Sequence, residues 1–134
     1  MEIWKAASRP TRRANPDYFT GDVWQDPVID APAPASIRAL VVHFAPGGRT
    51  HWHTHPLGQT LHVLSGVGRF QLEGEPVREI RPGDTVWIAP GERHWHGAAP
   101  DHAMIHMAMQ ESQNGVAVAW AEAVSEADYA AAPA

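Results

Sequence analysis

The residues best suited to carry chemistry are histidines gathered in two short runs. One run reads HWHTHPLGQ over residues 51–59, and the other reads HWH over residues 94–96. Five of the nine histidines lie in these runs. Side chains at alternate positions of an extended strand point to the same side, so His53 and His55 can face one point. A histidine from the second run can then close the set around a divalent metal ion.

We predict a metal site formed by His53, His55, Gln59 and His94. Three neutral nitrogens and one amide oxygen leave coordination positions open, which suits a first-row divalent metal that acts on a small molecule. A structural zinc site is usually closed and often contains cysteine. Because these ligands carry no charge, the ion would keep its full positive charge. His51 shares the face of His53 but lies further along the strand, so we expect it at the rim.

The composition excludes several classes of function. Ten basic and 15 acidic residues give a formal net charge of -5, which argues against a nucleic-acid partner. The chain has no cysteine, hence no disulfide, thiolate site or cysteine nucleophile. Lys5 is the only lysine, so Schiff-base chemistry inside the fold is not expected. No run reaches membrane-spanning length and the first residues lack an apolar signal core, so we expect a cytoplasmic protein without a membrane partner.

Residues 38–110 repeat a short β-rich run followed by a Gly or Pro turn, a pattern typical of an all-β sandwich or barrel. The predicted strands cover 38–45, 60–65, 69–72, 77–80, 85–89 and 103–109. We read residues 1–36 as an N-terminal arm with one or two short strands. The Ala-rich tail 116–132 has Trp120 and other large side chains at helical spacing, so it predicts one C-terminal amphipathic helix. A separate short helical turn beginning at Ser125 is the alternative. The whole chain, 1–134, then forms a single domain.

The two-residue period of strands divides the barrel positions into inward and outward sets. We expect His43 and His62 to point outward. The predicted inward set is Leu40, Val42, Phe44, Gln59, Leu61 and Val63. In the last strand both faces are apolar, so the period does not decide whether the face with His106 or the face with Ile105 points inward.

Two motifs in this region resemble those of the cupin family. The pattern G-x5-H-x-H-x3-Q-x6-G over residues 47–66 looks like the first cupin motif, and Gly83 followed by PGERH at 90–94 looks like the second. Three positions depart from the general pattern, namely Gln59, Ala89 and Ala98. The resemblance covers residues 38–110 and implies a small jelly-roll β-barrel with a metal at its centre.

A closer resemblance extends over nearly the whole chain. Segments 50–61, 82–87 and 94–100 look like the manganese-dependent cupin hydroxynitrile lyases of bacteria. In that family three His and one Gln hold the metal, and they match His53, His55, Gln59 and His94. Further active-site histidines match His96 and His106, which favours an inward-facing His106. The resemblance implies Mn(II) as the metal, with Fe(II) or Zn(II) as alternatives.

The implied reaction can be argued from its parts. A cyanohydrin has a hydroxyl that must lose a proton and a cyanide that must leave. A dipositive ion can stabilise the developing anion, and a neutral histidine can take the proton. We expect His106 to be this base, with His96 as the alternative; His106 could instead be a core imidazole bonded to a carbonyl. Gln110 either orients the substrate or forms a core hydrogen bond.

Three functions from different classes remain open. The first is a hydroxynitrile lyase acting on a cyanohydrin, or on an aldehyde plus cyanide, with mandelonitrile as an example. The second is an O₂-dependent cupin dioxygenase with iron at the same ligands, and the third is a cupin that only binds a small ligand. Trp52, Trp87 and Trp95 either line an aromatic substrate pocket or belong to the core and to subunit contacts. We expect a homodimer or homotetramer, because the apolar outer face of the last strand needs a cover.

Overall fold

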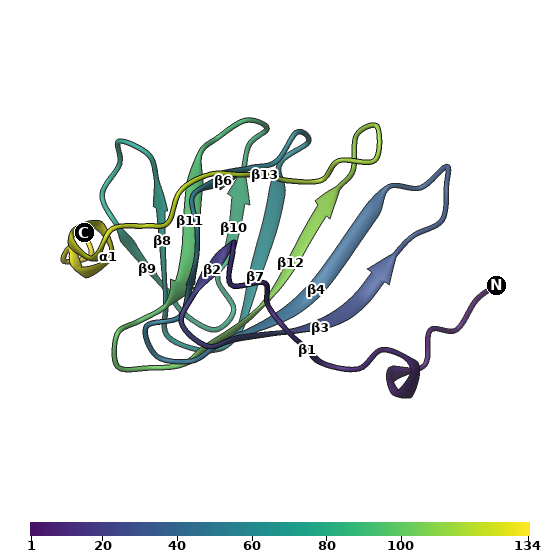
Figure 1. Cartoon of the computed structure of the whole chain (residues 1–134), viewed down its shortest axis with the longest axis horizontal. Coiled ribbons are helices and arrows are strands. Elements are labelled where there is room, and N and C mark those ends of the chain that lie inside the picture. The colour runs from purple at the N-terminus through teal and green to yellow at the C-terminus, as the bar shows by residue number, and fades with distance from the viewer.

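The computed structural model describes all residues from 1 to 134 and consists of two antiparallel sheets that face each other. Figure 1 shows the strands side by side, with the C-terminal helix at one end and the N-terminus at the other. The elements are η1 (Ala6–Ser8), β1 (Arg12–Arg13), β2 (Phe19–Thr20), β3 (Val23–Asp30), β4 (Ile37–Phe44), β5 (Arg49–Thr50), β6 (His53–Thr54), β7 (Gln59–Gly66), β8 (Gly68–Leu72), β9 (Arg78–Ile80), β10 (Thr85–Ile88), β11 (His94–Ala98), β12 (Met104–Glu111), β13 (Ala119–Trp120) and α1 (Glu126–Ala130).

The first sheet has the strand order β1-β3-β4-β12-β7-β10. The second has the order β13-β6-β11-β5-β2, and β8 joins it by pairing with β11 and β9. The prediction of an all-β fold built from short antiparallel strands is confirmed. From β4 onward the chain passes back and forth between the two sheets, one or two strands at a time, so residues far apart in the chain meet in the space between them.

The inward face of the first sheet follows the predicted alternation. Val42 and Phe44 are buried on β4, and their partners His106 and Met104 are buried on β12. His43 lies on the other face, where its ring nitrogen is 2.7 Å from Asp26 on β3. The buried pattern of β12 settles the question that its apolar residues left open, because its histidine face points inward.

The N-terminal segment contributes more to the barrel than its sequence suggests. β3 pairs with β4 along its whole length, so residues 23–30 form a full strand of the first sheet. Pro27 obscures this strand in the sequence, because proline cannot donate to a ladder and is confined to edges and bulges. In the structure the register shifts between Pro27 and Ile29, and this irregularity accommodates the proline.

The predicted C-terminal helix over 116–132 is wrong in extent. The only α-helix there is α1, five residues long, and Trp120 lies in β13, which pairs with β6. The amide of Asp128 donates to the hydroxyl of Ser125, which is the short helical turn considered as the alternative. Backbone bonds to the neighbouring sheet hold the upstream part extended, so tertiary pairing overrides the helix propensity of alanine.

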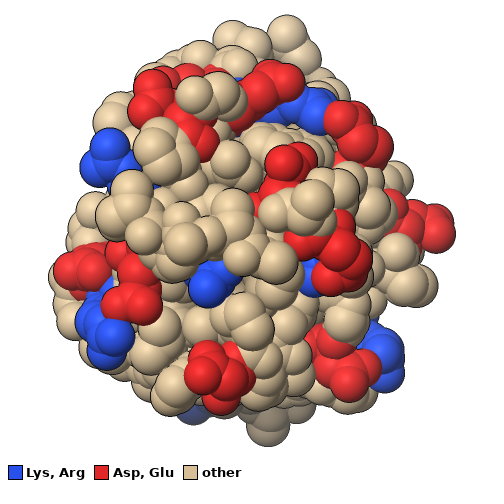
Figure 2. Space-filling view, turned by 90° about the vertical axis from the view of Figure 1, so that its left-hand side faces the viewer, with Lys and Arg blue, Asp and Glu red and all other residues tan.

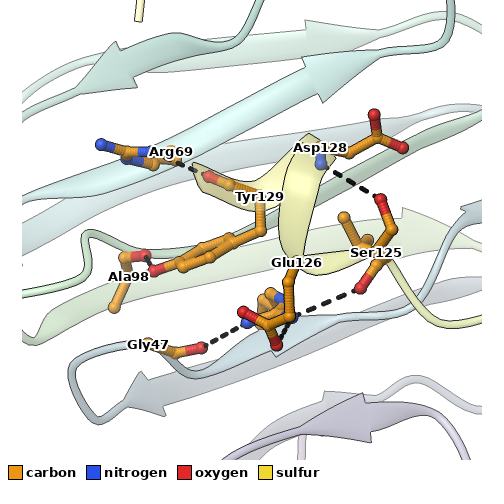
Figure 3. A network of polar contacts seen from close by, with 9 residues as sticks. Gly47, Arg69, Ala98, Ser125, Glu126, Asp128 and Tyr129 are labelled. Atoms are coloured by element: carbon orange, nitrogen blue, oxygen red, sulfur yellow. Dashed lines mark hydrogen bonds and ion pairs between the residues drawn. The ribbon is translucent and has the colours of Figure 1, made fainter. Parts of the chain in front are cut away.

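A buried arginine fixes α1 against the second sheet. The guanidinium of Arg49 lies 4.1 Å from the centre of the Tyr129 ring and donates to Glu126 at 2.8 Å and to the carbonyl of Gly47 at 3.3 Å. The hydroxyl of Tyr129 donates to the carbonyl of Ala98 at 2.5 Å (Figure 3). These contacts hold down the end of the C-terminal segment, whose earlier residues border the site described below.

The face that carries α1 shows acidic and basic side chains interspersed, with no single-sign patch (Figure 2). None of the chain's helices has the length and apolar character needed to cross a membrane.

Candidate metal centre

The four predicted ligands come together from three strands of the two sheets and from one connection between strands. His53 on β6 and His94 on β11 are direct partners across two neighbouring strands. Gln59 opens β7 in the opposite sheet, and His55 lies in the connection between β6 and β7. All four side chains are buried. The spacing of the first motif therefore works because the chain crosses from one sheet to the other between His55 and Gln59.

Three of the imidazoles are oriented by backbone carbonyls. A carbonyl oxygen can only accept, so each Nδ1 atom carries the proton and each Nε2 atom presents a lone pair. The three contacts join His53 to His51 at 2.8 Å, His55 to Ala117 at 2.7 Å and His94 to Glu92 at 2.9 Å. This is the tautomer and the type of anchoring that metal-binding histidines have.

The contact between Gln59 and His94 has the geometry of two ligands that share one cation. The amide nitrogen of Gln59 donates to Gln110 at 3.0 Å, which leaves its oxygen 3.1 Å from Nε2 of His94. Burial lowers the pKa of His94 to about 4, so this nitrogen carries no proton near neutral pH. Two lone pairs facing at this distance repel each other unless they share a cation, and neighbouring ligands at ~2.1 Å from one ion lie about 3 Å apart.

The surroundings of His55 also favour a bound cation. Nε2 of His55 is buried and has no hydrogen-bond partner, and an unpartnered buried polar atom is costly. A divalent metal would satisfy it together with the lone pairs of its neighbours. The residues therefore fit a divalent metal ion.

The tightest imidazole triad differs from the predicted one. Ring nitrogens of His53, His94 and His96 lie within 4.8 Å of one another, so the geometry brings His96 into the cluster. The nitrogen Nδ1 of His96 contacts Nε2 of His106 at 2.9 Å instead of a carbonyl. His96 thus lacks the carbonyl contact that orients the three predicted histidine ligands, so it differs from them in its surroundings.

All five histidines of this cluster are held neutral. Burial is the main cause that lowers the pKa of each, and neighbouring imidazoles add to it for His53, His94 and His96. Burial also lowers the pKa of His55, and it lowers that of His106 to about 4. The cluster therefore offers lone pairs for a metal and for a proton near pH 7.

A cavity of about 100 Å³ adjoins these histidines. His96 and Gln110 lie on its wall, whereas His106 lies behind His96 and does not line it. Its walls are Phe19, Gln25, Leu40, Val42, Phe44, Thr50, His53, His55, Gln59, His96, Ala108, Gln110, Ala117, Val118 and Trp120. Of the two candidate bases, the structure thus exposes His96 to the cavity.

The aromatic side chains of the cavity wall are Phe19, Phe44 and Trp120, of which the sequence predicted only Phe44 to point inward. Trp52 and Trp95 pack in the core, and Trp87 is exposed on the surface, so none of the three lines the cavity. Trp120 does, and its ring lies 4.7 Å from that of His53. Because the sequence predicted a helix over residues 116–132, it did not indicate that Trp120 lines the cavity. Ala117 and the half-buried His51 orient His55 and His53 through their backbone carbonyls. Every residue has such a carbonyl, so the sequence could not single out these two.

The chain resembles known proteins in both sequence and fold. The profile of the cupin domain family matches residues 40–108. The chain is 53% identical over 129 residues to the (R)-mandelonitrile lyase of Granulicella tundricola, an alignment that covers 96% of this chain and 98% of that protein. It also resembles the crystal structure of a cupin-like protein from Thermotoga maritima, with a TM-score of 0.83, 37% identity and coverage of 96% and 95%. The polyketide cyclase RemF from Streptomyces resistomycificus shares the fold, with a TM-score of 0.74, 19% identity and coverage of 96% and 90%.

Proposed function

The chain belongs to the cupin domain family, and we propose that it is a metal-dependent hydroxynitrile lyase that cleaves or forms cyanohydrins. The observation that carries the proposal is that the carbonyl-anchored imidazoles, such as His55 and His94, converge with the amide oxygen of Gln59. They do so beside a cavity whose wall also includes the unanchored imidazole of His96. Identity of 53% with an (R)-mandelonitrile lyase over almost the full length supports the reaction type.

We propose His53, His55, Gln59 and His94 as the metal ligands and Mn(II) as the ion, with Fe(II) or Zn(II) as alternatives. When bound, such an ion supplies positive charge that stabilises an oxyanion developing on the substrate. The neutral ligand set leaves that charge undiminished. The amide of Gln59 is kept with its oxygen toward the site by the bond that its nitrogen donates to Gln110.

We assign the proton transfer to His96, with His106 as its positioning partner. Nε2 of His96 is buried without a partner and belongs to a cavity wall, so it can accept the hydroxyl proton of a cyanohydrin. As the O–H bond breaks, the carbon–carbon bond to cyanide breaks and the carbonyl forms. Cyanide leaves with its electron pair and takes the proton to give HCN. Nδ1 of His96 meanwhile donates to His106, which stabilises the imidazolium.

The remaining cavity walls bind the organic part of the substrate. Phe44, Val42 and Leu40 form an apolar strip along β4, and Trp120 faces it from the C-terminal segment. These side chains also exclude water, which strengthens electrostatic interactions inside the site.

The test is cyanide release from racemic mandelonitrile and from acetone cyanohydrin, measured in air and under strict anaerobiosis. We expect metal-dependent turnover that is equal in both atmospheres. Turnover that requires O₂ and iron would favour a dioxygenase instead. Tight binding of a carbonyl compound without any turnover would favour a cupin that only binds a ligand.

We further propose that the chain assembles as a homodimer or homotetramer. The support is exposed apolar surface, with Trp87 61% and Leu64 46% exposed on the outer side of the first sheet. A monomer mass by light scattering at micromolar concentration would contradict this. A cytoplasmic location stays a prediction from the sequence.

A further inference from the structure

An arginine-lined groove lies directly outside the cavity. The groove has a volume of about 380 Å³ and shares four wall residues with the cavity, namely Leu40, Gln110, Ala117 and Val118. The N-terminal arm, the ends of β3 and β4 and the C-terminal segment enclose it. The shared residues make this groove the neighbouring space that a longer substituent of a substrate in the cavity would meet.

The groove is cationic although the chain as a whole is acidic. Its lining includes Arg9, Arg12 and Arg38, and Asp30 is the one acidic residue among them. The local excess of two positive charges contrasts with the formal net charge of -5 for the chain. Such a concentration of one sign at the mouth of a cleft attracts small ligands of the opposite sign.

Two of these arginines have no carboxylate partner. Arg9 donates to backbone carbonyls, including that of Val28 at 3.2 Å, and Arg12 donates to the side-chain oxygen of Gln25 at 3.2 Å. Arg38 contacts Asp30 at 3.2 Å, but the two side chains are 36% and 71% exposed. An ion pair so open to water is weak and can yield to a better-placed anion.

Strand register places Arg38 at the level of the metal centre. Arg38 is the partner of Gln110, and Gln110 is the partner of Gln59, across β4, β12 and β7. Two strand spacings separate Arg38 from Gln59, which is about 10 Å between Cα atoms. Arg38 also shares the inward face of β4 with Leu40, so a substituent that passes Leu40 meets its guanidinium.

Resting on the proposed function, we infer that the substrate is a short aldehyde, or its cyanohydrin, whose far end carries a carboxylate bound by Arg38 in this groove. The cavity of about 100 Å³ limits the part next to the reacting carbon to a few atoms. A planar carboxylate matches the fork of a guanidinium, which binds it through two parallel hydrogen bonds.

A matched substrate pair tests the inference. The two substrates are 4-cyano-4-hydroxybutanoate and 2-hydroxypentanenitrile, in which a methyl group replaces the carboxylate. At low ionic strength we expect the anionic cyanohydrin to have a kcat/KM for cyanide release about tenfold higher, or about 1.4 kcal/mol. The preference should shrink as NaCl is added, because the groove is open to solvent.

Three variants assign the preference to the groove. Arg38→Met should remove most of it while leaving the backbone carbonyl that accepts from Gln110. Asp30→Asn should increase it severalfold by freeing Arg38. Arg13→Met is the matched control, because Arg13 lies on the same arm but outside the groove, paired with Asp22 at 2.6 Å, and it should keep the wild-type preference.

A binding measurement separates this inference from the proposed reaction. Calorimetric titration with 4-hydroxybutyrate should show binding that Arg38→Met weakens, whereas 1,4-butanediol should not bind. If no cyanohydrin releases cyanide, mandelonitrile and acetone cyanohydrin included, but this binding persists, the proposed reaction fails and the anion site stands. If cyanide is released equally from both cyanohydrins and Arg38→Met changes nothing, the anion site is refuted and the reaction stands.

Discussion

Acid should destabilise the metal-free protein well before its carboxylates are protonated. A histidine whose pKa in the folded state lies below 6.5 takes up its proton first in the unfolded chain, so stability is complete above pH 6.5 and falls as the pH drops toward 4. The pKa values of His94 and His106 are lowered to about 4. Each should therefore cost about 2 kcal/mol of unfolding free energy between pH 7.5 and pH 5.0.

The combined loss should exceed about 4 kcal/mol, because burial also lowers the pKa values of His53, His55 and His96. That is a large part of the roughly 5–15 kcal/mol typical of a domain. The depressed carboxyl pKa values, such as that of Asp26, act below this pH window.

Urea unfolding of the metal-free protein at pH 7.5, 6.5, 5.5 and 5.0 measures this effect. His106→Gln should reduce the acid loss by about 2 kcal/mol, and His102→Gln, which replaces an exposed histidine, is the control and should leave it unchanged. Metal-loaded protein should resist acid until the pH at which the ion is released. An unfolding free energy that stays within 1 kcal/mol between pH 7.5 and 5.0, about half of one histidine's share, would refute this account of the cluster.

Three substitutions test other parts of the account. Gln59→Glu should retain metal by elemental analysis but lower kcat at least about tenfold, because a charged ligand weakens the ion's field and the amide donor is lost. Leu40→Ala should raise kcat/KM for mandelonitrile relative to acetone cyanohydrin. The reason is that the cavity of about 100 Å³ is smaller than the ~150 Å³ cavity that accepts benzene. An unchanged ratio would show that Leu40 does not limit substrate size. Tyr129→Phe should lower the unfolding free energy by about 1 kcal/mol through loss of the buried bond to Ala98, whereas Tyr18→Phe, whose hydroxyl makes no such bond, should not.

The ligand motif was readable because its chemistry depends on spacing. Alternating positions of an extended segment share a face, so the sequence predicts that His53 and His55 converge. They do so in the structure although β6 ends at Thr54 and His55 lies in the connection to β7. The inward direction of His106 was not decidable from β12, since both faces of that strand are apolar. A resemblance to known cupins favoured the correct face, and the pairing with β4 and β7 explains it.

Tertiary contacts account for what the sequence reading missed. The Ala-rich tail has helical spacing, yet strand pairing with β6 holds Trp120 extended and turns it toward the cavity. Pro27 makes β3 hard to recognise in the sequence. The strand accommodates this proline at an irregularity in its pairing with β4, which only the structure shows. The choice between His96 and His106 as the group facing the cavity depends on which imidazole lies in front, and the two-residue period of a strand carries no information on that order.

The most direct test of the central claim is metal content and anaerobic cyanide release measured in the same preparations. We expect wild-type protein to hold about one divalent ion per chain, to lose turnover when stripped by a chelator and to regain it with Mn(II). The double variant with His53→Ala and His55→Ala should bind no metal and release no cyanide. The control variant His51→Ala keeps the carbonyl that orients His53, so it should bind metal and release cyanide. Full metal occupancy in the double variant, or undiminished turnover in the stripped enzyme, would contradict the account.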